Sequence, residues 1–341
     1  MKGLSLFNKI VFALNVIVFS LLLLACAIPY LTDEFFSFLS FLSLSVPLLV
    51  IINLVFFLYW LVLRKRQMLL SLFILILGYF VLDTFFKFGT NTEIIEEDNL
   101  KVMSFNVHGF NVFGDFDRLG LYEEIKDFVK KEDPDIIGFQ EVSYRMDETY
   151  LDYPYGFVKR IRSGNKVHLG IFSKYPILKA EIIHFPNSIN NGSYADILYK
   201  NDTIRFYNVH MQSLGITPGS GNVRSKTTEQ IYENLSSRFK RQLKQAKMIE
   251  DHKATSPYPI ILCADMNNTQ FSNVYQALKG DSQDSFIEKG NGFGRTYNLF
   301  QFPLRIDYIL ADHNFQVISH ENYDQKLSDH FPVMASFRLK Q

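Results

Sequence analysis

The stretch RIDYILADHNFQVISHENYDQKLSDHFPV, Arg305 to Val333, decides the fold of the C-terminal part of this chain. Asp307 stands beside the apolar run YILA, and Asp329 stands directly before His330. A carboxylate next to a buried strand lowers stability unless it has a partner. The stretch therefore predicts strands whose ends carry acids with a specific partner, and the rest of the chain indicates what that partner is.

The same pattern recurs between Asn99 and Gln341, where short β-branched or aromatic runs end in polar residues. The runs are KVMSFNV, DIIGFQEV, HLGIFSK, TIRFYNVH, PIILCADMN, RIDYILA and FPVMASFRL. The polar residues at their ends include Asn106, Glu141, Asn208, His210, Asp265, Asn267, Asp307, Asp329 and His330. One Asn or Asp after a strand is usually a turn former. So many such ends in one domain indicate a shared site.

Two amphipathic segments lie between these runs, Leu121 to Lys131 and Ile231 to Asp251, with apolar residues at spacings of three and four. The strand-like runs are too apolar to face water on either side. Strands mixed with helices in this way predict an α/β sandwich with helices covering both sheets.

The residue types at the strand ends share one chemistry. Asn and Glu oxygens are hard ligands that suit Mg²⁺. Imidazoles near carboxylates hold a phosphate oxygen or move a proton near neutral pH. A metal, an acid that orients water and imidazoles together describe phosphoester hydrolysis.

On these residues the sequence resembles the endonuclease/exonuclease/phosphatase family, which includes DNase I-like nucleases, abasic-site endonucleases, inositol polyphosphate 5-phosphatases and neutral sphingomyelinases. The resemblance covers Asn99 to Gln341 and depends on SFNV, GFQEV, NVHMQS, CADMN, RIDYIL and SDHFPV in the family's order. It implies a four-layer α/β sandwich, in which two packed, mostly antiparallel sheets are flanked by helices. It also implies a phosphoric ester hydrolase that uses Mg²⁺, with Mn²⁺ as a substitute.

The resemblance assigns a metal site and a water site. Asn106 and Glu141 bind the metal, with Glu141 as the principal ligand, and Asp329 is a further ligand. Asp265 orients or deprotonates the attacking water, and Asn267 helps to position that water and the phosphate.

The resemblance also implies a phosphate site. His330 contacts the scissile phosphate, and Asp307 holds the His330 ring in the required tautomer. His210 matches a second imidazole that faces the phosphate. Asn208 and Arg224 are candidate substrate-binding residues.

Three features near these motifs are open to more than one interpretation. His108 stands where abasic-site endonucleases carry an additional acidic ligand, and we interpret it as a solvated loop histidine, with contact to the substrate as the alternative. The long loop Leu214 to Gln230 is where we expect substrate specificity. A concentration of basic residues is interpreted as a solvated helix face or, alternatively, as a surface that binds anionic lipid headgroups or a polyanion. Its members are Arg224, Lys226, Arg238, Lys240, Arg241, Lys244 and Lys247.

The first ninety residues form a predicted membrane anchor, followed by a linker at 91–98 and the enzyme domain at 99–341. Its three apolar segments, at about 10–31, 36–63 and 67–86, predict transmembrane helices. The third reaches spanning length only if Asp83 lies near the interface. A cleaved signal peptide is the alternative for the first.

Basic residues predict the orientation of this anchor, because they favour the cytoplasmic side. Lys2 and Lys9 precede the first segment, and Arg64 to Arg66 follow the second. With three spans, the enzyme domain is extracytoplasmic, and periplasmic if the protein is bacterial and lies in the inner membrane. If the third segment does not cross, the domain is cytoplasmic. Two cysteines give no disulfide framework.

Charge favours one substrate class. Residues 1–90 contain six of the 35 basic and three of the 35 acidic residues, which leaves 29 and 32 for residues 91–341. A surface that coats duplex DNA is usually more basic. We therefore expect a membrane-anchored phosphodiesterase that acts on a phospholipid headgroup or small phosphoester, without an inferred protein partner. An extracytoplasmic nuclease is the first alternative, and a catalytically silent membrane-tethered binding module is the second.

Overall fold

The structure is a computed structural model, and the chain in it divides into two compact units. It describes residues 4–31, 39–82, 86–89, 98–111, 120–143, 146–159, 168–215, 227–299 and 301–340. The helical unit contains Met1–Phe85, Lys226–Leu243 and Asn268–Ala277. The sandwich unit contains Phe86–Ser225, Lys244–Asn267 and Leu278–Gln341.

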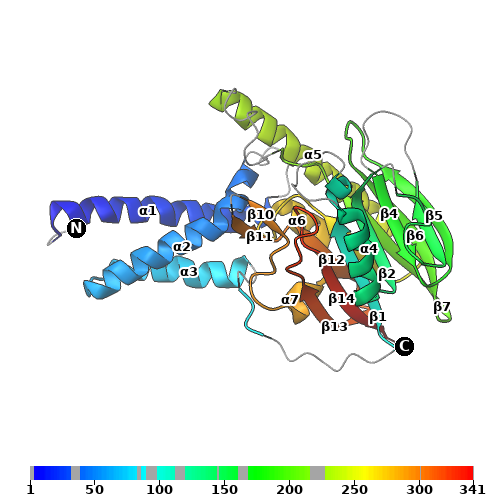
Figure 1. The fold of residues 1–341 in the computed structure, drawn as a ribbon. Helices are drawn as coiled ribbons and strands as arrows, with labels where there is room; N and C mark the ends of the chain where they lie inside the picture. The colour runs from blue at the N-terminus through cyan, green and yellow to red at the C-terminus, as the bar shows by residue number, and fades with distance from the viewer. Residues whose placement is uncertain are drawn as a thin grey trace. The chain divides into compact units, whose positions relative to one another are not determined.

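The sandwich unit contains two six-stranded sheets (Figure 1). The first has the order β13-β14-β1-β2-β4-β3, in which β1 and β2 are parallel and the other neighbours antiparallel. Its strands are β1 (Leu100–Asn106), β2 (Ile136–Val142), β3 (Tyr155–Val158), β4 (His168–Ser173), β13 (Phe315–Asn322) and β14 (Val333–Leu339).

The second sheet has the order β5-β6-β7-β8-β12-β9, in which β7 and β8 are parallel and the other neighbours antiparallel. Its strands are β5 (Ile177–His184), β6 (Asn191–Tyr199), β7 (Asp202–His210), β8 (Ile260–Asp265), β9 (Gln283–Asp284) and β12 (Asp307–Ala311). A separate hairpin joins β10 (Tyr297–Leu299) to β11 (Phe302–Leu304).

The sheets pack face to face because alternate strand residues are apolar on both sides. In β1, Leu100 and Val102 enter the core between the sheets, whereas Met103 and Phe105 pack on the opposite face. The core between the sheets also receives Ile136, Ile171, Ala195, Ile197, Ile204, Phe206, Ile261, Cys263, Ile309, Val333 and Phe337, among others. Removal of this apolar surface from water is the main force that holds the sandwich together.

Helices cover the outer faces of both sheets. In α4 (Leu121–Glu132) the apolar stripe packs on the outer face of the first sheet, and lysines in the last turn suit the helix dipole. The C-terminal part of α5 (Thr228–Ala254) contacts the second sheet, where the Tyr207 hydroxyl and His252 Nδ1 lie 2.7 Å apart. Two packed mixed sheets flanked by helices confirm the predicted sandwich. The shorter helices are η3 (His108–Asn111), α6 (Asn273–Lys279) and α7 (Ser285–Lys289).

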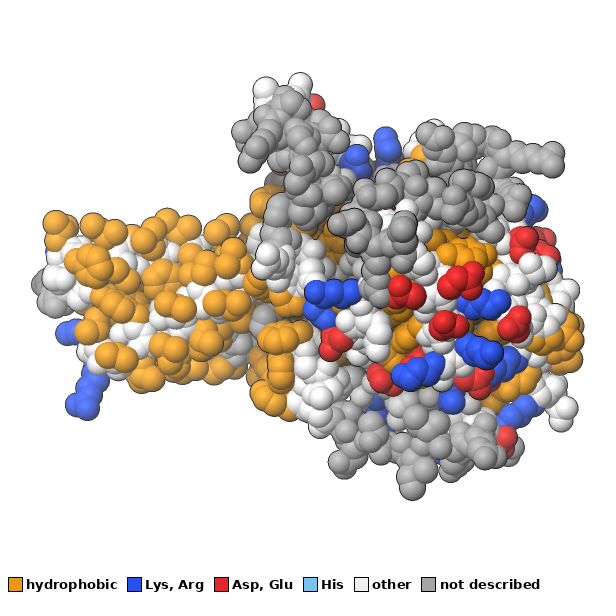
Figure 2. All heavy atoms as spheres, viewed as in Figure 1, with side chains coloured by type: hydrophobic (Ala, Val, Ile, Leu, Met, Phe, Trp, Pro, Cys, Tyr) orange, Lys and Arg blue, Asp and Glu red, His pale blue; other side chains and the backbone are white. Residues whose placement is uncertain are grey.

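The helical unit contains α1 (Leu6–Ala27), the short η1 (Ile28–Tyr30), α2 (Phe41–Val62) and α3 (Met68–Val81). Residues 6–30 and 41–62 are long and apolar enough to cross a membrane, and only 22% and 33% of their most apolar windows are buried. The third expected span is shorter than predicted: α3 has 14 residues, or about 21 Å, against a hydrocarbon core of about 30 Å. The described residues therefore contain two helices of spanning length rather than three. Figure 2 shows hydrophobic side chains over the outer surface of these helices.

A polar cluster joins the three helices of the bundle. Asn15 Nδ2 of α1 donates to Ser71 Oγ of α3 at 2.8 Å, and Trp60 Nε1 of α2 donates to Asn15 Oδ1 at 3.1 Å. All three residues are fully buried. Hydrogen bonds of this kind stabilise one packing arrangement of apolar helices.

Candidate active site

Strand pairing brings three of the predicted residues together in the second sheet. In the parallel pair β7 and β8, His210 lies in register with Asp265. In the antiparallel pair β8 and β12, Asp265 lies in register with Asp307. The three strands therefore place an imidazole and two carboxylates side by side, at the end of the sheet where β7 and β8 end and β12 begins.

The first sheet contributes Asn106 and Glu141 from the ends of its parallel strands. Asn106 is the last residue of β1 and lies in register with Gln140 of β2. The register of β2 is interrupted between Phe139 and Val142, and Glu141 has a φ of 51°. Bulges and left-handed backbone outside glycine occur preferentially where a strand must direct a side chain into a site.

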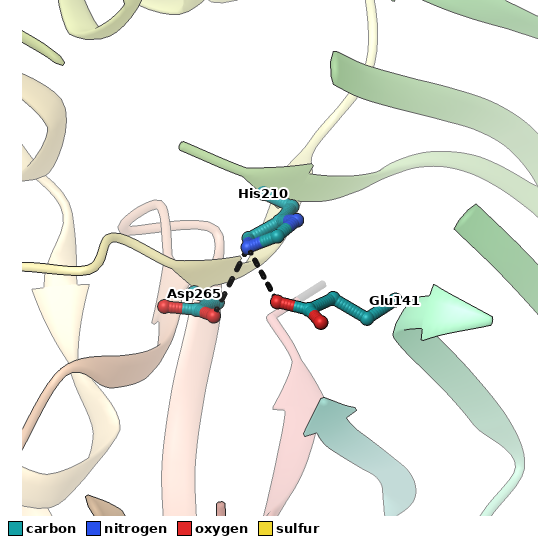
Figure 3. Close-up of side chains that lie close together, drawn as sticks. All are labelled: Glu141, His210 and Asp265. Carbon is teal, nitrogen blue, oxygen red and sulfur yellow. Dashed lines mark ion pairs between the residues drawn. The ribbon is translucent and has the colours of Figure 1, made fainter. Parts of the chain in front are cut away.

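Glu141, His210 and Asp265 form the first cluster, shown in Figure 3. His210 Nε2 lies 3.3 Å from Glu141 Oε1 and 3.4 Å from Asp265 Oδ2. The Asn106 amide donates to the same two oxygens, at 3.2 and 2.8 Å. The two carboxylates are thus directed at one small volume, an arrangement that suits a divalent cation with hard oxygen ligands.

The two carboxyl groups of this cluster have opposite pKa shifts. Burial alone raises the pKa of Glu141, but a hydrogen bond from His108 and the charges of His210 and His330 hold it well below its usual range. Burial raises the pKa of Asp265 to about 6, although the charge of His330 opposes the shift. Opposed shifts of neighbouring acids are typical of sites in which one acid stays ionised and another exchanges a proton.

Asp307 and His330 form the second cluster. His330 Nδ1 lies 2.9 Å from Asp307 Oδ2, and His330 Nε2 lies 3.8 Å from Asp265 Oδ2. Burial alone lowers the pKa of His330, but the carboxylates of Asp307 and Asp265 raise it well above its usual value. The Thr296 hydroxyl accepts from the backbone N–H of Asp307 at 3.1 Å, which holds the start of β12 in place.

Asn267 lies against both Asp265 and His210. Its backbone N–H donates to Asp265 Oδ1 at 2.8 Å, and its side-chain Nδ2 lies 3.1 Å from His210 Nε2. The same Nδ2 donates to the Met211 carbonyl at 3.1 Å. The φ of Asn267 is 49°, so the residue adopts a left-handed conformation that the surroundings must stabilise.

Asp329 reaches the first cluster through His108. His108 Nδ1 lies 3.6 Å from Asp329 Oδ2 and 3.5 Å from Glu141 Oε2. The interpretation of His108 as a solvated loop residue is therefore wrong, because its ring lies between two acids. Among the described residues, Glu141 lies close enough to His210 and Asp265 to share one metal ion with them. Asp329 is not part of that group.

Of the two predicted substrate-binding residues, the structure describes only Asn208, and Asn208 is not part of this cluster. Asn208 is fully buried, and both of its amide hydrogens bind carbonyl oxygens, those of Phe139 at 2.9 Å and Gly170 at 3.0 Å. Its Oδ1 accepts from the Gln140 amide at 2.7 Å. Asn208 therefore connects the two sheets from inside. Arg224 lies outside the described residues.

Two residues of the site were missed by sequence reasoning. The ring of Tyr297 lies 5.0 Å from the His330 ring, and burial, with the charges of Asp329 and other acids, raises the Tyr297 pKa to about 12. Asn190 is buried, and its Nδ2 lies 3.0 Å from His210 Nδ1. Neither residue ends an apolar strand run, so the pattern that identified the others gives no signal for them.

Comparison with known protein families gives two matches to this chain. A sequence model of the endonuclease/exonuclease/phosphatase family matches residues 103–330, more than half of the chain. The chain belongs to the endonuclease/exonuclease/phosphatase family. A second model, described as a domain of unknown function, matches residues 8–85. No curated protein sequence matches the chain.

Solved structures share the fold at low sequence identity. A family protein from Bacteroides thetaiotaomicron is 20% identical with a TM-score of 0.53, over 71% of this chain and 98% of that one. TDP2 of D. rerio, in complex with a single-strand DNA product, is 16% identical with a TM-score of 0.51, over 70% and 99%. A mannosyl-6-phosphatase from Bacteroides thetaiotaomicron is 20% identical with a TM-score of 0.50, over 70% and 100%. These likenesses establish the fold, and the neighbours differ in what they act on.

Proposed function

We propose that this protein is a membrane-anchored, divalent-metal-dependent phosphoester hydrolase of the phosphodiesterase type. The observation that carries the proposal is the convergence of the Glu141, His210 and Asp265 cluster with the Asp307 and His330 pair. Attack on a phosphoester requires three groups in one site: an ionised acid, an acid that exchanges a proton, and a cationic imidazole.

Asp265 is the proposed base for the attacking water. Its pKa of about 6 lies near the pH at which a general base works best, because the group is largely ionised and still accepts a proton. The backbone N–H of Asn267 holds Oδ1, which fixes the direction of the carboxylate. The side chain of Asn267, next to His210, positions the water and the phosphate.

His330 is the proposed donor to the scissile phosphate. Its Nδ1–H donates to Asp307, which leaves Nε2 facing the site, and Nε2 carries a proton when the ring is an imidazolium. Because the pKa of His330 is raised, the ring is an imidazolium at neutral pH and stabilises negative charge that develops on the phosphate oxygens. His210 supplies a second imidazole, whose Nε2 lies 3.4 Å from the same Asp265 oxygen that His330 approaches.

Glu141 and Asn106 are the groups that would hold Mg²⁺ or Mn²⁺, with Glu141 as the principal ligand and Asp329 as a more distant one. The bound ion would supply Lewis-acid polarisation of the phosphoryl oxygen. Two carboxylates that face one volume repel each other, and a cation between them relieves that repulsion.

The proposed substrate is a phospholipid headgroup or a small phosphoester. Support comes from two helices of spanning length whose outward side chains are Leu, Ile, Phe and Val. An apolar surface of this extent requires a lipid or protein environment. An enzyme held at a bilayer has its highest local substrate concentration there.

We also propose that the sandwich unit is extracytoplasmic, because α3 returns the chain to the end of the bundle opposite the basic turn between α2 and α3. Leu82, after α3, packs in the same cluster as Ile28 and Leu42, so α3 ends at the same end of the bundle as the connection between α1 and α2. The basic turn Arg64 to Arg66 lies between α2 and α3, at their other ends. Basic residues favour the cytoplasmic side.

The first experiment uses the full-length protein in lipid nanodiscs. Hydrolysis is measured with Mg²⁺, Mn²⁺ or EDTA against bis-p-nitrophenyl phosphate, p-nitrophenyl phosphate, phospholipid vesicles and plasmid DNA. We expect metal-dependent turnover of the diester and of vesicle lipid, and its loss in Glu141→Gln and His330→Ala. The full chain is required because residues 226–243 and 268–277 belong to the helical unit.

Glu288→Gln and His313→Ala are the matched controls, because both residues are exposed and lie outside the two clusters. They should retain wild-type turnover. If the protein hydrolyses only plasmid DNA, the lipid-substrate proposal fails and the nuclease alternative takes its place. A folded protein that binds metal but hydrolyses none of the four substrates would contradict the enzyme proposal in favour of a silent binding module.

Orientation is tested by labelling in intact cells. Both native cysteines, Cys26 and Cys263, are buried, so a new surface cysteine dominates the signal. Glu288→Cys should react with a membrane-impermeant maleimide in intact cells, and Lys65→Cys only after permeabilisation. The reverse pattern would place the sandwich unit in the cytoplasm.

A further inference from the structure

Residues Asn268 to Asn273, hereafter the 268–273 segment, follow directly after Asn267 but belong to the helical unit. The sequence of the segment is NTQFSN, and only one of its six residues is apolar. All six are nevertheless buried. A polar segment without regular strand structure is usually exposed, so its burial calls for specific partners.

Those partners lie at one end of the helical bundle. Asn273 Nδ2 donates to the Leu31 carbonyl at 2.8 Å, and Ser40 Oγ donates to Asn273 Oδ1 at 3.2 Å. Thr269 Oγ1 donates to the Ser43 carbonyl at 3.2 Å. The segment thus binds the chain just after η1 and the beginning of α2 through three hydrogen bonds, of which the one to Leu31 is partly buried and the other two are buried.

Apolar packing and one further hydrogen bond complete the junction. Phe271, 2% exposed, packs in the cluster that contains Leu22, Ile28, Leu42 and Leu82 of the bundle. The amide of Asn268 donates to Gln242 Oε1 of α5 at 2.9 Å. Loss of such a buried partner leaves a desolvated polar atom and destabilises the junction.

The segment is joined by one peptide bond to the catalytic turn. Asn267 has left-handed backbone and carries the N–H that holds Asp265 Oδ1. A residue in that conformation keeps it only when its neighbours determine it. On the C-terminal side of Asn267, those neighbours are the residues that the bundle holds.

We propose that the helical bundle is a positioning element of the active site, in addition to being an anchor. By holding Thr269 and Asn273, it fixes the 268–273 segment and, through the chain, the turn that carries Asp265 and Asn267. This inference rests on the proposed function. It makes the rate of the chemical step depend on the junction between the bundle and the segment.

The test compares kcat and KM of full-length variants in nanodiscs, with Mg²⁺ and the soluble diester bis-p-nitrophenyl phosphate. Thr269→Val replaces the hydroxyl by a methyl group of the same size, and Asn273→Ala removes the bonds to Leu31 and Ser40. We expect kcat to fall about tenfold in each with KM nearly unchanged, because small displacements of a catalytic group lower the rate strongly. Thr269→Ser keeps the hydroxyl and should retain wild-type kcat.

Ser71→Ala is the matched control. It removes a buried hydrogen bond inside the bundle, from Asn15, without touching the segment. It should lower thermal stability and leave kcat at the wild-type value. Wild-type kcat in both Thr269→Val and Asn273→Ala, or an equal fall of kcat in Ser71→Ala, would overturn the inference.

Hydrogen exchange gives a readout that does not depend on turnover. The Met266 N–H donates to the Ile306 carbonyl at 2.9 Å, and the Asn267 N–H to Asp265. These amides should exchange faster in Asn273→Ala than in wild type, and not in Ser71→Ala. If the wild-type protein hydrolyses no substrate, the proposed function fails, and this comparison alone decides whether the bundle positions the turn.

Discussion

Arg305 and Asp307 are two residues apart, are both buried, and belong to ion pairs of different kinds. Arg305 Nη1 lies 2.6 Å from Asp284 Oδ2, and both side chains are 1% exposed. The guanidinium lies over the rings of Phe286 and Tyr308, 4.7 Å from each centroid. Its charge is matched and enclosed by aromatic groups, so loss of one partner would leave the other as an uncompensated buried charge.

The Asp307 and His330 pair is different because a second acid, Asp265, faces the same imidazole. The three acids and two imidazoles of the site form two groups that share Asp265, and within each group the ligand atoms lie within 4.8 Å of one another. No arrangement for stability alone requires this. The comparison teaches that a buried charge with a closed set of partners indicates structure. An excess of buried acid beside imidazoles indicates a site.

The largest effect is expected for Asp265→Asn, which removes the proposed base. The fall in kcat should be about 10³-fold, within the usual range for general-base catalysis. The protein should remain folded, because the substitution also removes a charge whose burial is unfavourable. Turnover of the soluble diester and thermal denaturation measure the two quantities, and Asp281→Asn, at an exposed position, is the control.

The pH dependence of stability tests whether folding raises the pKa of Asp265. Folding raises the pKa of Asp265 to about 6, from an ordinary value of about 4. Between these pH values the unfolded chain loses a proton that the folded protein keeps, so stability falls as pH rises from about 4 to about 6. Asp265→Asn should lack this fall in metal-free buffer. An unchanged profile would mean that Asp265 is not responsible.

The next effect concerns the structural pair. Asp284→Asn leaves Arg305 buried without its counter-ion, and we expect the free energy of unfolding to fall by about 3–5 kcal/mol. Below the unfolding transition, kcat should match that of the wild type. Urea denaturation and diester turnover separate the two. If the fully folded Asp284→Asn variant loses kcat, the Arg305 and Asp284 pair also contributes to catalysis, and the contrast with the Asp307 and His330 pair is wrong.

A smaller effect is expected for Asp307→Asn, which keeps the shape of the side chain but removes its charge. The pKa of His330 should fall, because the Asp307 carboxylate is what chiefly raises it. We expect kcat to fall about 100-fold, the lower end of the usual contribution of a positioned acid–base group. The alkaline limb of the pH profile of kcat/KM should also move to lower pH, since imidazolium is the active form. An unmoved limb would assign it to another group.

The sequence predicted the parts of the site that follow from strand periodicity. Asp265, Asp307 and His210 end or begin apolar runs, and pairing of β7, β8 and β12 then makes them neighbours. The fold followed from the same runs, because strands apolar on both faces require a layer on each side.

The remaining features depend on tertiary contacts that no local pattern encodes. His108 was misjudged because its partners, Glu141 and Asp329, come from distant segments. Asn208 has the same spacing pattern as His210, yet it lies deeper between the sheets, where its amide is fully hydrogen-bonded. The membership of the 268–273 segment in the helical unit was not visible either, because polar residues after a strand indicate an exposed loop.

The smallest effect on kcat is expected at Tyr297, because this residue contributes a neutral hydroxyl to a site of charged groups. Its pKa, which burial and then the nearby acids raise to about 12, keeps the hydroxyl protonated at working pH. Tyr297→Phe keeps the ring beside His330 and removes only the O–H. We expect kcat to fall about three- to tenfold, the value of one hydrogen bond, with the His330 limb of the pH profile unmoved. Tyr297→Ala should lower kcat further, because the ring that packs on the imidazole is lost. If Tyr297→Phe retains full activity while Tyr297→Ala does not, the hydroxyl plays no part and Tyr297 serves only to hold the His330 ring.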